Sequence, residues 1–101
     1  MPKLYEYFGL IILFYSNEHE PIHVHGKYQS TESKAEIIFE KGEFKEVIIS
    51  EVKGKNPLDH RNERKFRKVV ELLREDIVRK WVDFFVYNKV VKFEVISKKL
   101  D

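Results

Sequence analysis

The sequence predicts a single α+β domain: a mainly antiparallel sheet of four or five strands packed against one long bent helix or two consecutive helices. Three observations carry this prediction. Apolar residues alternate with period two through much of residues 10–52, and the period changes to 3.6 between about residues 57 and 87. The third is size, because 101 residues with 43% hydrophobic content suit one core. We therefore expect one domain over residues 1–101 with an aromatic-rich core.

The first two strands are predicted on either side of a polar loop. Every residue from 10 to 15 is apolar, which is typical of a strand covered on both faces in the interior of a sheet. Residues 16–21 read as a loop that ends at a proline. Residues 22–29 then alternate, with Val24 and Tyr28 on one face and polar side chains on the other.

The next two strands are predicted to form a hairpin. A polar connection over residues 29–33 leads to an alternating strand over residues 34–40. Lys41-Gly42 then makes a tight turn, because glycine readily adopts a positive φ. Residues 44–52 return as the partner strand with an irregular apolar pattern, which leaves either a β-bulge or burial on both faces open.

The helical region is expected to begin with Asn56 as the N-cap and Pro57 at the first helical position. One stripe of this region is apolar: Phe66, Val69, Val70, Leu73, Ile77, Trp81 and Phe84. The apolar surface widens after Asp76, so one bent helix and two helices with a second cap near Asp76 both remain open. A short final strand is predicted over residues 90–96.

Basic residues gather on the side of the helical region opposite the apolar stripe. Residues 51–80 carry ten basic and six acidic side chains, whereas residues 1–50 carry five basic and eight acidic ones. The candidate contacts for RNA, DNA or an acidic partner are Arg61, Arg64, Lys65 and Lys68. A solvated helix face is the commoner explanation of such a pattern.

Composition excludes several classes of protein. The absence of cysteine rules out disulfides and cysteine-ligated metals, and it fits a cytoplasmic protein. The apolar run over residues 10–15 is far shorter than the roughly 20 residues of a membrane span, and no signal peptide frames it. No glycine-rich phosphate loop, serine or cysteine nucleophile motif, or EF-hand is present. We therefore expect a cytoplasmic protein without a membrane partner.

Three of the four histidines lie close together, at His19, His23 and His25. On a strand, His23 and His25 point to the same face, roughly 6.6 Å apart along the chain. Neutral imidazole binds zinc and other divalent transition metals, so these residues form a candidate metal site with His19 or with Glu18 or Glu20. Three ligands and one water would leave the open position that catalysis requires.

The same histidines allow three other interpretations. His23 and His25 could act as base and acid in phosphodiester cleavage, with Lys27 stabilising charge on the phosphate, as in a small ribonuclease. The cluster and the basic helix could instead bind nucleic acid or an acidic protein without catalysis. In the third interpretation the histidines are structural and hydrogen-bond to the backbone or to solvent. The residues themselves leave all of these open.

Aromatic side chains raise a related alternative. Four tyrosines of the strand regions could stack on nucleic-acid bases, although half-burial against neighbouring strands is commoner. They are Tyr5, Tyr7, Tyr15 and Tyr28. Trp81 lies on the apolar stripe and is predicted to belong to the core, whereas His60 is predicted to lie at the surface.

The first 28 residues resemble the opening signature of the family called domain of unknown function 4160. The matching series is Phe8-Gly9, an apolar strand ending at Phe14-Tyr15, then Asn17-Glu18-His19-Glu20-Pro21-Ile22-His23-Val24-His25, and Tyr28. The later layout of hairpin, helical stretch with a tryptophan and short last strand is similar as well. The sequence departs from the family pattern at Glu18, where aspartate is usual, and at Ile22, where a second proline is usual.

This resemblance implies a regulatory or partner-binding role and supplies no mechanism. Members of the family are small, bacterial or phage-associated, and often encoded beside the family called domain of unknown function 2442, as toxin–antitoxin pairs are. We therefore expect a regulatory or binding component of a toxin–antitoxin-like system whose site is the histidine cluster, with a protein of that second family as partner. The alternative is a histidine-based nuclease acting on RNA, either metal-dependent or metal-free.

Overall fold

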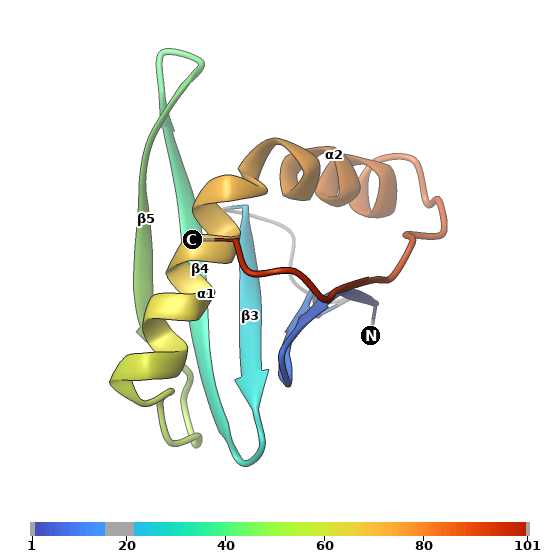
Figure 1. The fold of residues 1–101 in the computed structure, drawn as a ribbon. Coiled ribbons are helices and arrows are strands. Elements are labelled where there is room, and N and C mark those ends of the chain that lie inside the picture. The colour runs from blue at the N-terminus through green and yellow to red at the C-terminus, as the bar shows by residue number, and fades with distance from the viewer. Residues whose placement is uncertain (1, 16–21, 101) are drawn as a thin grey trace.

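A computed structural model describes residues 2–15 and 22–100 and shows an α+β fold, as predicted. Its six-stranded sheet has the order β5-β4-β3-β2-β1-β6. Helix α1 lies along β4 and β5, and α2 continues from α1 in a different direction (Figure 1). The elements are β1 (Lys3–Tyr7), β2 (Leu10–Leu13), β3 (His23–Tyr28), β4 (Thr31–Glu40), β5 (Glu43–Glu51), α1 (His60–Leu72), α2 (Arg74–Phe85) and β6 (Glu94–Ile96). Neighbouring strands are antiparallel except β1 and β6, which are parallel.

Both helices pack on one face of this sheet because its apolar side chains point there. On β3, Val24 is buried in the core, and Gly26 faces the helices. A Cβ added to Gly26 would lie 2.7 Å from the ring of Phe66, which is itself 0% exposed. The missing side chain of Gly26 therefore lets α1 lie directly on the strand.

The two turns of β3, β4 and β5 decide which residues belong to the sheet. Lys41 and Gly42 have φ angles of 54° and 81°, which confirms the predicted tight turn. The β3–β4 connection is shorter than predicted, because the chain turns at Gln29, whose φ is 54°, and β4 begins at Thr31. The predicted polar connection over residues 29–33 is therefore right for residues 29 and 30 and wrong for residues 31–33, and Glu32 belongs to a strand.

The irregular pattern of β5 comes from a β-bulge. Ile38 pairs with Glu46, but Phe39 pairs with Phe44, so β5 contains one extra residue at this point. The shift turns Phe44 toward the helices, where the guanidinium carbon of Arg74 lies 4.4 Å from its ring centroid. Of the two alternatives that the sequence leaves open, the bulge is present.

The first helix does not begin where the sequence predicts. Asp59 is the N-cap, and its side chain accepts a hydrogen bond from the backbone amide of Asn62 at 2.8 Å. The predicted cap, Asn56, is held at the sheet instead, since its carbonyl accepts from the backbone amide of Glu32 at 2.8 Å. Pro57 accordingly lies in the connection before α1.

The helical region consists of two consecutive helices. They meet at Leu73, whose φ of −105° and ψ of 17° interrupt the helical backbone, so the break lies before Asp76. The predicted stripe faces the core, with Phe66, Val69, Val70 and Ile77 at 0% exposure, and Trp81 is buried as expected. Across the described residues, no helix has both the length and the apolar character needed to cross a membrane.

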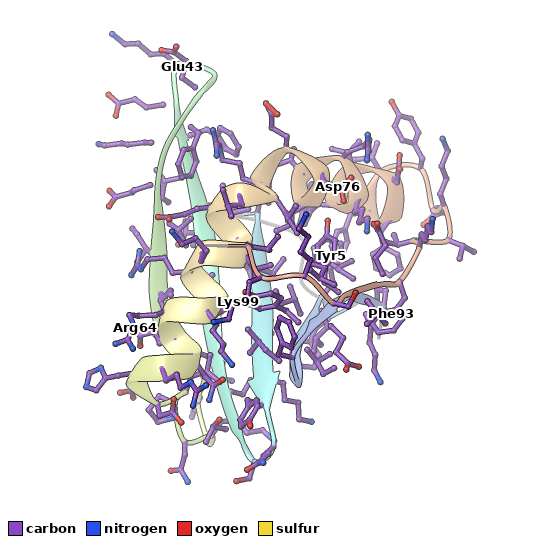
Figure 2. All side chains as sticks on the ribbon, viewed as in Figure 1. Tyr5, Glu43, Arg64, Asp76, Phe93 and Lys99 are labelled. Carbon is purple, nitrogen blue, oxygen red and sulfur yellow. The ribbon has the colours of Figure 1, made fainter. Side chains whose placement is uncertain are left out.

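A buried lysine attaches the C-terminal segment to the rest of the fold. Lys80 of α2 is 7% exposed, and its Nζ lies 2.6 Å from Oε2 of Glu94 in β6. The same ammonium lies 3.4 Å from Oδ2 of Asp76 and 4.2 Å from the ring centroid of Tyr5. Figure 2 shows Asp76 near Tyr5, whose hydroxyl donates a hydrogen bond to it. These contacts join α2, β1 and β6.

Candidate functional site

Two of the three clustered histidines lie on the face of the sheet away from the helices. His23 and His25 share this face, as their spacing predicts, and their ring centroids are 5.6 Å apart. The side chain of Lys27 shares it too, because it lies one further alternation along β3. His23 is 9% exposed and His25 is 4% exposed. We call this side of the sheet the histidine face.

A buried glutamate from β4 completes a hydrogen-bonded group on the histidine face. Glu32 lies opposite Lys27 in the strand register and is 1% exposed. Its Oε2 accepts a hydrogen bond from the hydroxyl of Tyr15 at 2.8 Å and lies 3.0 Å from Nδ1 of His25. The ring of Tyr15 also meets that of His25 edge-on, with centroids 4.4 Å apart.

Glu32 is a site residue that the sequence analysis misses. It lies in a stretch with no apolar residue, and a polar run of this kind is typical of an exposed turn. Nothing local indicates that strand pairing buries the carboxylate beside a histidine seven residues away along the chain. Only the register of β3 against β4 brings the two together.

The chemistry available to this group is that of an oriented imidazole. A carboxylate at Nδ1 fixes the orientation of a histidine ring and favours the tautomer in which Nε2 is the acceptor. The other carboxylate oxygen of Glu32, Oε1, is buried and has no hydrogen-bond partner among the residues that the structure describes. In the ranges 2–15 and 22–100, no three histidine, aspartate or glutamate side chains are placed to hold a metal ion. His19, Glu18 and Glu20 lie outside the described residues, so the predicted metal site stays a prediction.

The basic side chains predicted as partner contacts come together at a second place, on the other side of the sheet. Arg61, Arg64, Lys65 and Lys68 follow the i, i+3, i+4, i+7 spacing of one helix face. They line a pocket of about 530 Å³ together with Tyr7, Phe8 and Lys99. Figure 2 shows Arg64 on α1 and Lys99 beside the same helix. We call this hollow the basic pocket.

The positive charges of the basic pocket are not neutralised within the described chain. Its lining contains five cations and no carboxylate. None of the five forms an ion pair with another residue in the part of the chain that the structure describes. The nearby N-cap Asp59 has a lowered pKa chiefly because the Asn62 amide donates to it, and the charge of Arg61 acts in the same direction.

Phe8 and Lys99 are pocket residues that the sequence analysis misses. Phe8 forms the β1–β2 turn with Gly9, at φ angles of 48° and 89°, and its side chain is 48% exposed. Lys99 reaches the pocket because the backbone amide of Leu100 donates to the hydroxyl of Tyr7 at 3.1 Å. A glycine between two apolar segments is the available signal for the turn. No local signal predicts that the C-terminal segment returns to it.

The other aromatic and histidine predictions divide between core and surface. Tyr5 and Tyr7 are 2% and 4% exposed, so the commoner interpretation of strand tyrosines holds for them. Tyr15 and Tyr28 are partly buried. His60 is exposed, as predicted.

The comparison with protein families agrees with the resemblance in the first 28 residues. The family model described as Domain of unknown function (DUF4160) matches residues 9–82, a range that includes the histidine face and all of α1. No curated protein and no solved structure matches the chain. Since the family model spans well over half of the 101 residues, the chain belongs to the DUF4160 family.

Proposed function

We propose that this protein is a non-enzymatic binding protein of the cytoplasm that recognises a polyanionic partner through the basic pocket. The observation that carries the proposal is the convergence of five cations from two distant segments around one hollow, which no carboxylate of the described residues lines. Such a group produces a positive potential that attracts phosphates or other clustered anions. Each anionic contact also releases counterions from the polyanion, which favours binding at low salt.

The alternative to a binding site is a solvated helix face, and the pocket differs from one in two respects. Lys99 joins the four cations of α1 from a segment more than thirty residues away in sequence. The half-exposed ring of Phe8 lies among these charges and adds apolar surface to the pocket. Both features favour a ligand with which charge and apolar surface can interact.

The regulatory setting of the proposal is a toxin–antitoxin-like pair. It rests on the family's arrangement beside the family called domain of unknown function 2442, and a protein of that family is proposed as a second partner, in addition to the polyanion at the basic pocket. The burial of His23 and His25, at 9% and 4% exposure, also supports binding over catalysis, because a substrate has little access to rings so covered.

The proposal is tested by retention on immobilised heparin, which offers a polyanion without nucleobases. We expect the double variant Arg64→Gln/Lys68→Gln to bind heparin about tenfold more weakly than the wild type, because two of the pocket cations are lost. The matched control is Lys53→Gln/Lys55→Gln, which removes the same charge from exposed residues outside the pocket. Equal losses in both variants would show that net charge alone controls retention, and would refute the pocket as the site.

A histidine-based RNA nuclease is the second candidate, and one observation favours it. The 3.0 Å contact of Glu32 with Nδ1 of His25 is the arrangement in which a carboxylate orients a catalytic imidazole. His23 and Lys27 on the same face would supply the partner acid and a charge for the phosphate. RNA cleavage by the wild type, with and without a chelator, tests both the metal-dependent and metal-free forms. Turnover that disappears in a folded His25→Asn variant would replace the binding proposal.

A further inference from the structure

The backbone of Phe8 adopts a conformation that is unfavourable for an aromatic residue. Both residues of the Phe8-Gly9 turn have positive φ, the conformation of a type I′ hairpin turn, in which asparagine, aspartate or glycine is preferred at the first position. A bulky aromatic residue with positive φ is an outlier, because its side chain crowds the backbone. Strain of this kind persists only where the surrounding structure holds it in place, and it is enriched at functional sites.

The surroundings of Phe8 hold the ring in place without burying it. Its centroid lies 4.9 Å from that of Tyr7 in an edge-on contact, and Tyr7 is 4% exposed and accepts a hydrogen bond from Leu100. Behind the turn, Gly9 lies close to the ring of Tyr28, since an added Cβ would come within 3.1 Å of it. The turn is thus anchored on its inner side, while 48% of Phe8 stays in contact with water.

We propose that the basic pocket binds single-stranded nucleic acid, with one base stacked on Phe8 and the phosphates held by the cations of α1. This inference rests on the proposed polyanion recognition and adds the class of ligand. An aromatic ring beside a positively charged groove is the combination that binds unpaired strands, because stacking accepts any base while cations follow the backbone.

The alternatives fit this pocket less well. In a duplex both faces of each base are already stacked, so the ring of Phe8 has no face of a base to meet. A carboxylate-rich peptide would match the cations, but its anions are repelled by the negative face of an aromatic ring. The cations from Arg61 to Lys68 extend over about 10 Å of helix, at 1.5 Å per residue, and can follow a strand as it leaves the ring.

The test is a fluorescence-anisotropy titration of a labelled 12-nucleotide single-stranded RNA, with the same sequence as single-stranded DNA and as duplex. Phe8→Asn is expected to weaken binding of the single strand by about 5- to 100-fold, the range of one base stack. Phe8→Trp is expected to retain it. The matched control Phe39→Asn removes a ring that is also exposed and edge-on to a neighbour, and it should leave the affinity within about twofold.

Two further readouts separate stacking from charge and from folding. The slope of log K against log salt should fall in magnitude by about 1.4 in Arg64→Gln/Lys68→Gln, at about 0.7 per contact, and stay unchanged in Phe8→Asn. Asparagine tolerates positive φ, so Phe8→Asn should melt no lower than the wild type, whereas loss of a structural ring would lower Tm.

The outcomes distinguish base stacking on Phe8 from the proposed recognition of polyanions on which it rests. If Phe8→Asn binds the single strand as tightly as the wild type, or if the duplex binds as tightly as the single strand, base stacking is refuted. Heparin retention that still depends on Arg64 and Lys68 would then leave polyanion recognition standing. If heparin retention ignores these two residues, both proposals fail together.

Discussion

Polar side chains are buried on one face of β3, and charged side chains lie at the surface on the helix that covers the other. On the histidine face, His23 and His25 are almost fully buried, and His25 contacts a carboxylate that is itself 1% exposed. On the other face, Gly26 brings α1 onto the strand, and the charged side chains of that helix remain at the surface around the basic pocket. Buried polar groups must bond to one another to offset lost hydration, whereas exposed charges need no partner in the protein. The histidine face thus contributes to stability, and the helix side of the same sheet presents charges to solvent.

The difference teaches where to look for function in a small domain. The histidine cluster is the most conspicuous candidate site in the sequence. In the structure His23 and His25 are buried, and their contacts help to hold the strands together. The basic residues are individually ordinary, and their importance comes from the absence of neutralising partners among the described residues. Three changes to the protein would break or sharpen this comparison.

The largest expected effect is on the histidine face. Glu32→Ala should lower the free energy of unfolding by about 2–4 kcal/mol, because it leaves the hydroxyl of Tyr15 and Nδ1 of His25 without their shared carboxylate. Urea denaturation of this variant and of Glu40→Ala measures it. Glu40, on the same strand, pairs with Lys45 in solvent, and its loss should cost less than about 1 kcal/mol. Equal costs would mean that the buried carboxylate does not stabilise the face.

A smaller effect is expected at the contact between β3 and α1. Gly26→Ala should destabilise the protein by about 1–3 kcal/mol, because the added Cβ overlaps the ring of Phe66. Thermal unfolding measures this cost. The double variant Gly26→Ala/Phe66→Leu should cost less than the sum of the two single changes, since the smaller side chain makes room. Strict additivity would contradict the close contact.

The smallest effect is expected at the Tyr5–Asp76 contact, through its pH dependence. Burial, and then the hydrogen bond and charge of Asp76, raise the pKa of Tyr5 above its ordinary value of 10.0. The neutral hydroxyl therefore contributes stability that is complete below about pH 10 and declines as the pH rises further. Tyr5→Phe should cost about 1 kcal/mol at pH 7 and remove this alkaline decline, as followed by unfolding at pH 7 to 11. A decline as steep as that of the wild type would assign it to other groups.

The Tyr5–Asp76 contact also makes stability depend on pH in acid, where stability falls as the pH decreases. Burial would raise the pKa of Asp76, but the hydrogen bond from Tyr5 and the charges of Lys80 and Arg79 outweigh burial and lower it below 3.8. The carboxylate therefore contributes stability above about pH 4 that is lost as the pH falls. Tyr5→Phe should weaken this acid dependence as well.

Local patterns in the sequence predict most of the sheet and helices, because alternation and helical periodicity are properties of neighbouring residues. They place β2, β3 and the β4–β5 hairpin, and they put the four cations of α1 on one face. The predicted last strand is also present, although it is confined to Glu94–Ile96. The start of α1 is mispredicted because both Asn56 and Asp59 can cap a helix, and only the sheet contact of Asn56 decides between them.

The site residues that could not be predicted from the sequence depend on contacts between distant segments. Glu32 reaches His25 only through strand register, and Lys99 reaches Phe8 only because the C-terminal segment returns to β1. Strand β1 itself is not predicted, although it pairs with the neighbouring β2, and its second pairing, with β6, joins residues about ninety positions apart. Long-range pairing leaves no trace in a local pattern.

The bulge in β5 also affects whether two molecules of this protein can pair through the edges of their sheets. β5 is one edge of the sheet, and a long, regular edge strand offers its free backbone groups to a strand from another molecule. The extra residue between Phe44 and Glu46 breaks that regularity, and four of the nine residues of the strand are charged. The opposite edge, β6, is only three residues long. Both borders are therefore poor templates for edge-to-edge pairing with a strand of another molecule.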